Sequence, residues 1–214
     1  MKLILKISLV LLFISTALCT SAQKYAIEGG YTNPMRTSKI GSSNGSTTFF
    51  YGGKLGGTAR FEIAKNTSFL TGALYSLVYA DRLSGVSSTE MLTYKTTGHF
   101  IDIPLHAIYS LPISKNTKFF AYAGPTINVG IAQNMNVTSS ITTPSSYNLG
   151  KFNVYKDPEY KLNRLNLQIG LGGGIQWKKY QLKSGYDFGI TNLSKVDTSK
   201  LYQKGWFVTF SYEF

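Results

Sequence analysis

The chain of 214 residues has a single cysteine and two histidines. Cys19 lies in an N-terminal segment that we expect to be removed, so we expect no thiol in the mature chain. This excludes disulfides and cysteine-based metal or nucleophile sites. The two histidines, His99 and His106, are isolated and make no metal-binding pattern. We therefore expect no cofactor and no metal.

Long apolar runs and charged residues are also scarce. Beyond the N-terminus, no stretch offers the roughly 18 consecutive apolar residues that a membrane-spanning helix needs. Charged residues make up only 15% of the chain, whereas aromatic residues make up 14%. These proportions suit a chain whose outer surface faces lipid.

The N-terminus predicts export. Lys2 and Lys6 precede or interrupt an apolar run over 7–13, and small residues follow up to 20–22. This is the pattern of a secretory signal peptide over 1–22, which leaves residues 23–214 as the mature domain. The alternative is a lipoprotein lipidated at Cys19, but the bulky Leu18 before it argues against this.

The charge balance is basic. Without residues 1–22 the chain keeps twenty basic and ten acidic residues. A basic excess can indicate nucleic acid, anionic lipid or solubility alone. The sequence has no dense Lys/Arg run, and an exported protein rarely meets nucleic acid, so we expect no nucleic-acid partner. About 190 residues suit one domain, which we expect to be a monomer.

The last nine residues alternate in polarity. Trp206, Val208, Phe210, Tyr212 and Phe214 share one face, and the other face is polar apart from Phe207. This pattern is typical of the closing strand of an outer-membrane β-barrel. In that class a terminal aromatic is an assembly signal, so we predict that Phe210, Tyr212 and Phe214 are recognised by the barrel-assembly machinery. The alternative is an ordinary terminal strand of a soluble sandwich.

Eight segments alternate in this way, and each is long enough for the ~9–11 residues that cross a bilayer as a tilted strand. They are 24–32, 51–63, 68–80, 99–111, 118–131, 164–177, 180–191 and about 205–214. The third segment is the weakest. Its expected lipid face carries Phe69, Tyr75 and Tyr79, but Leu70 and Val78 define a rival register.

The connections differ in length on the two sides. Short turns are expected at 64–67, 112–117 and 178–179, whereas long polar loops are expected at 33–50, 81–98, 132–163 and 192–204. This asymmetry is typical of bacterial outer-membrane barrels, whose long loops are extracellular. Because no open sheet edge is tolerated in hydrocarbon, the first strand must close on the eighth. The sequence therefore predicts an all-β, eight-stranded antiparallel up-and-down transmembrane β-barrel.

Three segments also carry a family resemblance. FIDIPL at 100–105, AGP at 123–125 and YDFGITN at 186–192 resemble strands of the Bacteroidetes outer-membrane β-barrel family of PorT or porin type, an OmpA-like eight-stranded barrel. The end of the signal peptide at 21–23 is similar to those of that phylum. The resemblance implies architecture and outer-membrane localisation, and it implies little about activity.

The polar faces of the strands predict the barrel interior. An eight-stranded barrel is just wide enough for its own side chains to fill. The charged or titratable residues expected inside are Glu28, Lys54, Arg60, Glu62, Asp102, His106, Arg164, Lys183, Asp187 and Glu213. We expect these groups to neutralise one another in a plug. The alternative is a narrow porin, because inward glycines could leave free volume.

The long loops are the better candidates for function. A basic excess there is expected from Arg36, Lys39, Lys95, Lys195, Lys200 and Lys204. These side chains could contact lipopolysaccharide phosphates, and the loops could bind a surface glycan or a protein ligand. We therefore expect a structural or surface-interaction role.

We expect no enzyme. Asp102 and His106 share a face but lie about 13 Å apart along a strand, too far for an orienting hydrogen bond. A lipid-modifying enzyme would need His99 to meet a loop serine, and no nucleophile motif supports this.

Overall fold

The computed structural model describes residues 23–40, 45–85, 91–139, 150–156, 162–196 and 198–214. The predicted signal peptide over 1–22 lies outside the described residues. In the described part of the chain, no helix is long and apolar enough to cross a membrane.

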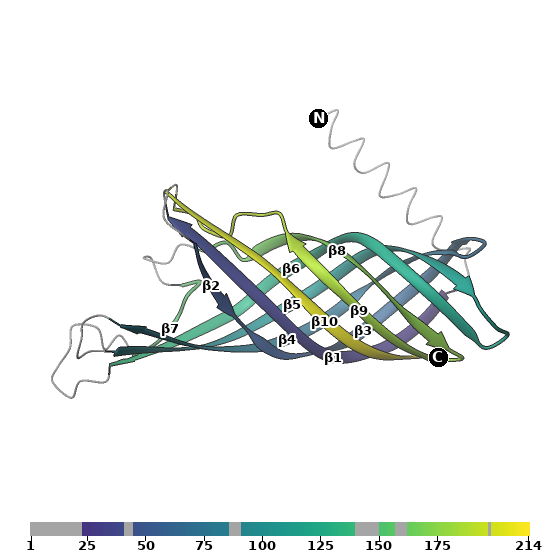
Figure 1. The fold of residues 1–214 in the computed structure, drawn as a ribbon, viewed down its shortest axis with the longest axis horizontal. Coiled ribbons are helices and arrows are strands. Elements are labelled where there is room, and N and C mark those ends of the chain that lie inside the picture. Colours follow the sequence, from purple (N-terminus) through teal and green to yellow (C-terminus); the bar gives the residue numbers. More distant parts are fainter. Residues whose placement is uncertain (1–22, 41–44, 86–90, 140–149, 157–161, 197) are drawn as a thin grey trace, which may run out of the picture.

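Eight long strands form a ring in the described part of the chain (Figure 1). They are β1 (Gln23–Ile40), β3 (Tyr51–Ala64), β4 (Thr67–Gly85), β5 (Met91–Pro112), β6 (Thr117–Ser139), β8 (Leu165–Trp177), β9 (Tyr180–Gly189) and β10 (Ser199–Glu213). Each is antiparallel to the next, and β10 also pairs with β1. The register of this closing pair runs from Ala26 opposite Glu213 to Ile40 opposite Ser199. The predicted closed, up-and-down antiparallel barrel is confirmed.

The two ends of the barrel differ. One end, called here the turn end, carries the turns Lys65–Asn66, Ile113–Asn116 and Lys178–Lys179 together with the start of β1 and the end of β10. The opposite end, called here the loop end, carries the long connections. Several strands continue far toward this end in Figure 1. The backbone N–H of Phe214 donates to the Tyr25 carbonyl at 2.9 Å, so the last residue continues the closing ladder at the turn end.

The strands are longer at the loop end than alternation predicted. β5 and β6 contain 22 and 23 residues, about twice the ~9–11 that a tilted strand needs to cross a bilayer. Two short strands, β2 (Ser46–Phe49) and β7 (Gly150–Asn153), also lie within predicted loops and pair with β1 and β6. The loop bounds predicted from polarity were therefore wrong. Outside the bilayer both faces of a strand can be polar. The hydrogen-bonded ladder between strands therefore continues where the sequence no longer alternates between apolar and polar residues.

Pro34 marks the place where β1 changes partner. Thr32 is opposite Gly52 of β3, whereas Met35 is opposite Phe49 of β2. Proline has no N–H to donate to a ladder. Its carbonyl still accepts a hydrogen bond from the Phe50 N–H at 2.7 Å. A proline inside a strand discourages extension of the predicted strand past residue 32, yet β1 continues to Ile40.

The ladder between β5 and β6 is interrupted at the place where the FIDIPL and AGP segments meet. The β5–β6 ladder skips from Pro104 opposite Thr126 to Ala107 opposite Ala123. Gly124 lies in this gap with a φ of 155°, and a Cβ there would approach the Leu105 carbonyl oxygen to 2.3 Å. The FIDIPL and AGP segments therefore face each other across one irregular site in the wall.

The outer surface of the ring is apolar and exposed. Typical examples along the strands are Ile27, Leu55, Tyr75, Leu111, Leu165, Leu171, Leu182 and Phe210, which are between 44% and 62% exposed. Water-soluble monomers rarely expose so continuous an apolar surface. The weak β4 segment takes its predicted register, because Tyr75 and Tyr79 face outward while Leu70 and Val78 are buried inside.

Candidate functional site

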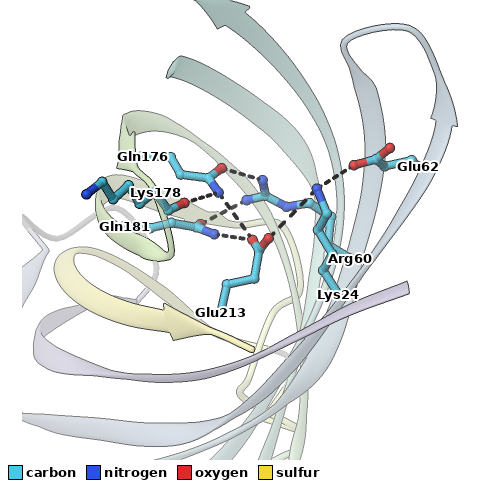
Figure 2. A network of polar contacts seen from close by, with 7 residues as sticks. All are labelled: Lys24, Arg60, Glu62, Gln176, Lys178, Gln181 and Glu213. Atoms are coloured by element: carbon cyan, nitrogen blue, oxygen red, sulfur yellow. Dashed lines mark hydrogen bonds and ion pairs between the residues drawn. The ribbon is translucent and has the colours of Figure 1, made fainter. Parts of the chain in front are cut away.

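The interior of the barrel begins at the turn end with a polar network (Figure 2). The Arg60 guanidinium donates to Gln176 Oε1 at 3.2 Å and to Gln181 Oε1 at 2.9 Å. The Gln181 amide in turn donates to Glu213 Oε2 at 2.8 Å. β3, β8, β9 and β10 are thus connected across the lumen. On the other side the Arg60 guanidinium lies 5.6 Å from the centre of the Phe120 ring.

An apolar cluster lies next to this network. It consists of Leu70, Ile108, Phe120, Tyr122 and Phe207, all nearly inaccessible. Phe207 interrupts the polar face of the last strand in the sequence, and its position explains why. Its ring packs against two inward lysines, which gives it both an apolar and a cation-binding role in the lumen.

Two ion pairs lie beyond the apolar cluster. Lys183 Nζ is 2.6 Å from Glu28 Oε1, which also accepts a hydrogen bond from the Thr209 hydroxyl at 2.8 Å. Glu28 is only 2% exposed. A buried carboxylate is costly unless it is paired and hydrogen-bonded, and here β1, β9 and β10 supply the partners.

The second ion pair connects four strands. Lys54 Nζ lies 3.2 Å from Asp102 Oδ2. The Ser76 hydroxyl donates to the same oxygen at 2.6 Å, and the Asn128 amide donates to Asp102 Oδ1 at 2.6 Å. Both carboxylate oxygens are therefore satisfied. The ammonium group of Lys54 lies 4.5 Å from the centre of the Phe207 ring, which couples the pair to the apolar cluster.

Inward glycines of β8 and β9 make room for aromatic rings. A Cβ at Gly185 would lie 1.7 Å from the Tyr122 hydroxyl, and one at Gly174 would lie 2.6 Å from Phe120 Cζ. The space beside these glycines is therefore not an open channel, because aromatic rings from β6 occupy it. His106 stacks on Tyr122 with ring centres 4.8 Å apart and shares a 2.9 Å hydrogen bond with Thr126.

A few buried polar atoms of the described residues have no hydrogen-bond partner: Tyr122 Oη, Asn166 Oδ1 and Nδ2, and Asp187 Oδ1. Asp187 is half-buried and lines a gap of about 20 Å³ beside Lys54 and Asp102. A gap of that size holds about one water molecule. Wider hollows lie at the two ends of the barrel.

The hollow at the loop end is the larger of the two. It has a volume of about 560 Å³ and is lined by residues that include Arg36, Phe50, Ala80, Tyr94, Met135 and Leu201. The hollow at the turn end has about 400 Å³ and is lined in part by Lys24, Arg60 and Glu62. The described residues contain no group of three or more His, Cys, Asp and Glu side chains that could hold a metal.

A ring of strands with apolar side chains outside and hydrogen-bonded charges inside is built for a membrane. The sequence matches the family described as "Outer membrane protein beta-barrel domain" over residues 21–195. The chain belongs to this family. Membership places the barrel in the bacterial outer membrane, where short turns face the periplasm and long loops face outward.

Solved structures similar to this outer-membrane barrel include Ail, the attachment invasion locus protein of Yersinia pestis. Ail is 14% identical, with 89% of this chain and 98% of Ail covered and a TM-score of 0.35. Neisserial surface protein A is 12% identical, with coverages of 90% and 99% and a TM-score of 0.41. The outer-membrane protease OmpT from Escherichia coli is 9% identical, with coverages of 91% and 98% and a TM-score of 0.43. No curated protein matches the chain.

Seven of the ten residues expected inside this outer-membrane barrel are buried there: Glu28, Lys54, Arg60, Asp102, His106, Lys183 and Glu213. Asp187 is half-buried beside them. Glu62 and Arg164 are not buried with them. Glu62 is exposed at the turn end, where its Oε1 accepts a 2.6 Å hydrogen bond from Lys24. Arg164 is exposed and donates to the Ile131 carbonyl at 2.8 Å. Both residues lie near strand ends, where an inward position can open to solvent.

Arg36 was also misplaced, because the sequence assigned it to an exposed basic loop. It is 6% exposed, and its guanidinium donates to Gln203 Oε1 at 2.8 Å and to Gln133 Oε1. The Phe50 and Phe100 rings pack against it at 5.1 and 5.5 Å. If the alternation of β1 is continued through Thr32 and Pro34, Arg36 falls on the inward face. The alternation therefore predicts the inward position of Arg36 once the strand is extended past the proline.

Proposed function

We propose that this outer-membrane barrel has a surface-interaction role and conducts no solutes. The observation that carries the proposal is the contrast between the filled middle of the lumen and the open hollow at the loop end. The gap beside Lys54 and Asp102 has about 20 Å³, whereas the loop-end hollow has about 560 Å³. A barrel of this kind offers a binding surface outside the cell and no continuous path through the membrane.

Single-channel recording tests this proposal. The folded mature protein, verified by heat-modifiable gel migration, is inserted into planar bilayers. We expect no discrete current steps above those of the bilayer alone. Reproducible steps from the unmodified protein would refute a non-conducting role. A deletion within 140–149 that left envelope integrity and binding at the cell surface unchanged would argue against the interaction role.

A narrow porin is the second candidate, and one observation favours it. Asp187 lines the narrow gap, and its Oδ1 has no hydrogen-bond partner. A carboxylate at a constriction would favour cations, provided that the neighbouring ion pairs rearrange. If the barrel conducts, Asp187→Asn is expected to reduce its preference for cations, as measured by the reversal potential in a salt gradient.

We also propose that outward lysines at the loop end contact lipopolysaccharide phosphates. Lys39 and Lys200 are both exposed and stand directly opposite each other in the β1–β10 ladder. Like charges in that position destabilise a strand pair, and a phosphate between them removes the repulsion. Added lipopolysaccharide is expected to raise the melting temperature of the native barrel more than that of K39Q/K200Q. Lys65→Gln, at the turn end, is the matched control.

We infer that the barrel is not an enzyme. The ring of His99 shares a hydrogen bond with the Tyr75 hydroxyl on the outer face of the barrel, so its bonded partner is a phenol and not a serine. His99→Ala is therefore expected to leave the outer-membrane lipid profile unchanged. A change in acylation pattern, measured by mass spectrometry of extracted lipid, would contradict this inference.

The finer expectations from the sequence remain proposals. We propose that residues 1–22 direct export, that Phe210, Tyr212 and Phe214 engage the assembly machinery, and that the barrel is monomeric. The FIDIPL, AGP and YDFGITN segments support placing the chain among Bacteroidetes barrels of PorT type. A surface glycan or protein could also be the ligand of the loops.

A further inference from the structure

We propose that the loop-end cavity binds an amphiphile that carries one anionic head group, a carboxylate or a phosphate, on an apolar chain. The proposal deepens the surface-interaction role above and rests on it. It depends on the charge at the bottom of the cavity, on the chemistry of the walls and on the volume.

Arg36 lies at the closed end of the cavity. Arg36, Ala80 and Gln133 lie farther from the loop-end termini of their strands than Tyr94 does, and Phe50 lies at the junction of β2 and β3, where its N–H donates to the Pro34 carbonyl. The side chain of Arg36 thus stands between the cavity and the filled lumen. A ligand that enters from the loop end would reach the guanidinium last.

The guanidinium of Arg36 has only neutral partners in the described part of the chain. The Gln203 and Gln133 amide oxygens accept from it. The other three deeply buried cations, Lys54, Arg60 and Lys183, lie with Glu28, Asp102 or Glu213 in networks that contain a carboxylate. A buried cation without an opposite charge is unfavourable, so an arriving anion would gain a desolvated and oriented partner.

The position of Arg36 is fixed before any ligand arrives. Two amide oxygens hold its donors, and the Phe50 and Phe100 rings pack against the guanidinium. A preorganised guanidinium loses little side-chain freedom on binding, which favours affinity. Planar, paired donors suit the two oxygens of a carboxylate or a phosphate.

The walls of the cavity suit an apolar chain. Phe50, Ala80, Met135, Val154 and Leu201 supply apolar surface, and hydroxyl groups from residues such as Thr96 are interspersed. Arg82 adds a second positive charge, and none of the described residues that line the cavity is acidic. The two positive charges disfavour cationic ligands, and the apolar walls favour a ligand that is mostly hydrocarbon.

The volume is also that of a small-molecule site. Ligand pockets typically have about 300–1,000 Å³, and this cavity has about 560 Å³. A cavity of this size encloses a medium-length acyl chain and is too small for a folded protein partner. The bound molecule would lie inside the extended part of the barrel, above the bilayer.

Isothermal titration calorimetry of the full mature protein in nanodiscs of zwitterionic lipid tests the proposal. The probes are octanoate, octyl phosphate, octanol and octyltrimethylammonium, each with heats from empty nanodiscs subtracted. We expect saturable one-site binding of octanoate or octyl phosphate and none of the cation. The relative affinities of the two anions distinguish a fatty-acid head group from a phosphate.

Three variants assign the binding to the cavity. Arg36→Gln is expected to weaken anion binding by about tenfold or more, because a charged hydrogen bond is lost. Ser38→Trp, which fills the cavity without removing charge, is expected to abolish binding. Lys65→Gln removes an equal charge at the turn end and is expected to have no effect. Heat-modifiable migration verifies that each variant is folded, and Arg82→Gln replaces Arg36→Gln if the latter does not fold.

Equal affinity for octanol and both anions, or anion binding that persists in Ser38→Trp, would overturn the proposal. Absence of any binding would overturn it as well. In either case a barrel that still conducts no current would retain its proposed surface-interaction role. Current steps through the unmodified barrel would instead refute the proposal that it conducts no solutes, whatever the calorimetry shows.

Discussion

Replacing Lys183 with methionine is expected to destabilise the barrel strongly. The substitution keeps an unbranched apolar stem and removes the ammonium group that lies 2.6 Å from Glu28 Oε1. Glu28 is 2% exposed and would keep only the Thr209 hydroxyl as a hydrogen-bond partner. Its carboxylate would then be a nearly uncompensated charge within the lumen.

The expected magnitude follows from this geometry. At 2.6 Å and an effective dielectric constant of about 20, the attraction between the two charges is about 6 kcal/mol. Much of this is offset by the cost of removing both groups from water. Removing one partner of a buried pair typically costs about 3–5 kcal/mol, and we expect Lys183→Met to lie in that range.

Urea unfolding in lipid bilayers measures this cost. Both tryptophans, Trp177 and Trp206, lie exposed on the outer face, so their fluorescence reports loss of the lipid contact. The double variant E28Q/K183M is expected to be more stable than Lys183→Met alone, because no unpaired charge remains. Lys65→Met, in the exposed turn between β3 and β4, is the control and is expected to have little effect.

Two results would refute the reasoning. If Lys183→Met lost less than about 1 kcal/mol, the pair would behave like an exposed salt bridge and water would have to reach it. If Glu28→Gln did not rescue Lys183→Met at all, the loss would come from packing against Phe207 and Tyr122 and not from charge.

Three further predictions follow from other parts of the barrel. Gly185→Ala is expected to lower the free energy of unfolding by about 1–3 kcal/mol, since its Cβ would overlap the Tyr122 hydroxyl. Gly53→Ala is the control and is expected to be tolerated, because its Cβ would meet its nearest neighbour at 3.6 Å. The urea midpoints of the two variants test this difference. Removal of Phe214 is expected to reduce the heat-modifiable band in outer-membrane fractions, and normal assembly would contradict its role as a signal. Lys178→Gly is expected to stabilise the β8–β9 turn by about 1 kcal/mol, because Lys178 has a φ of 54°, and a lower urea midpoint would contradict this.

The strands were predictable because lipid and lumen impose opposite requirements on successive residues. In β8, Leu165, Leu167, Ile169 and Leu171 face outward while Asn166 and Gln168 are buried, as strict alternation predicts. The same rule favoured one register of β4 without excluding the other, because Leu70 and Val78 are apolar and yet point inward. Apolar residues fill parts of the lumen, so polarity alone does not identify the inner face.

Prediction failed where the chain leaves the bilayer. Arg36 was assigned to a loop because alternation was followed only to Thr32 and residues 33–50 were interpreted as a long polar connection. In the structure β1 continues past the proline by changing its partner from β3 to β2. Outside the bilayer, a strand continues for as long as a neighbouring strand pairs with it. Such pairing requires no alternation of apolar and polar residues, so the sequence does not reveal it.

The sequence by itself determined that this chain is a barrel, and it identified the lipid face of most strands and most of the charges in the lumen, because side chains in a strand alternate between its two faces. Only the tertiary structure decided which charges meet. Lys183 lies beside Glu28, and Lys54 beside Asp102, because closure of β10 on β1 fixes the stagger of all strands around the ring. That stagger also brought Arg36, at the closed end of the loop-end cavity, against partners that are neutral among the described residues, a position that no local pattern in the sequence specifies.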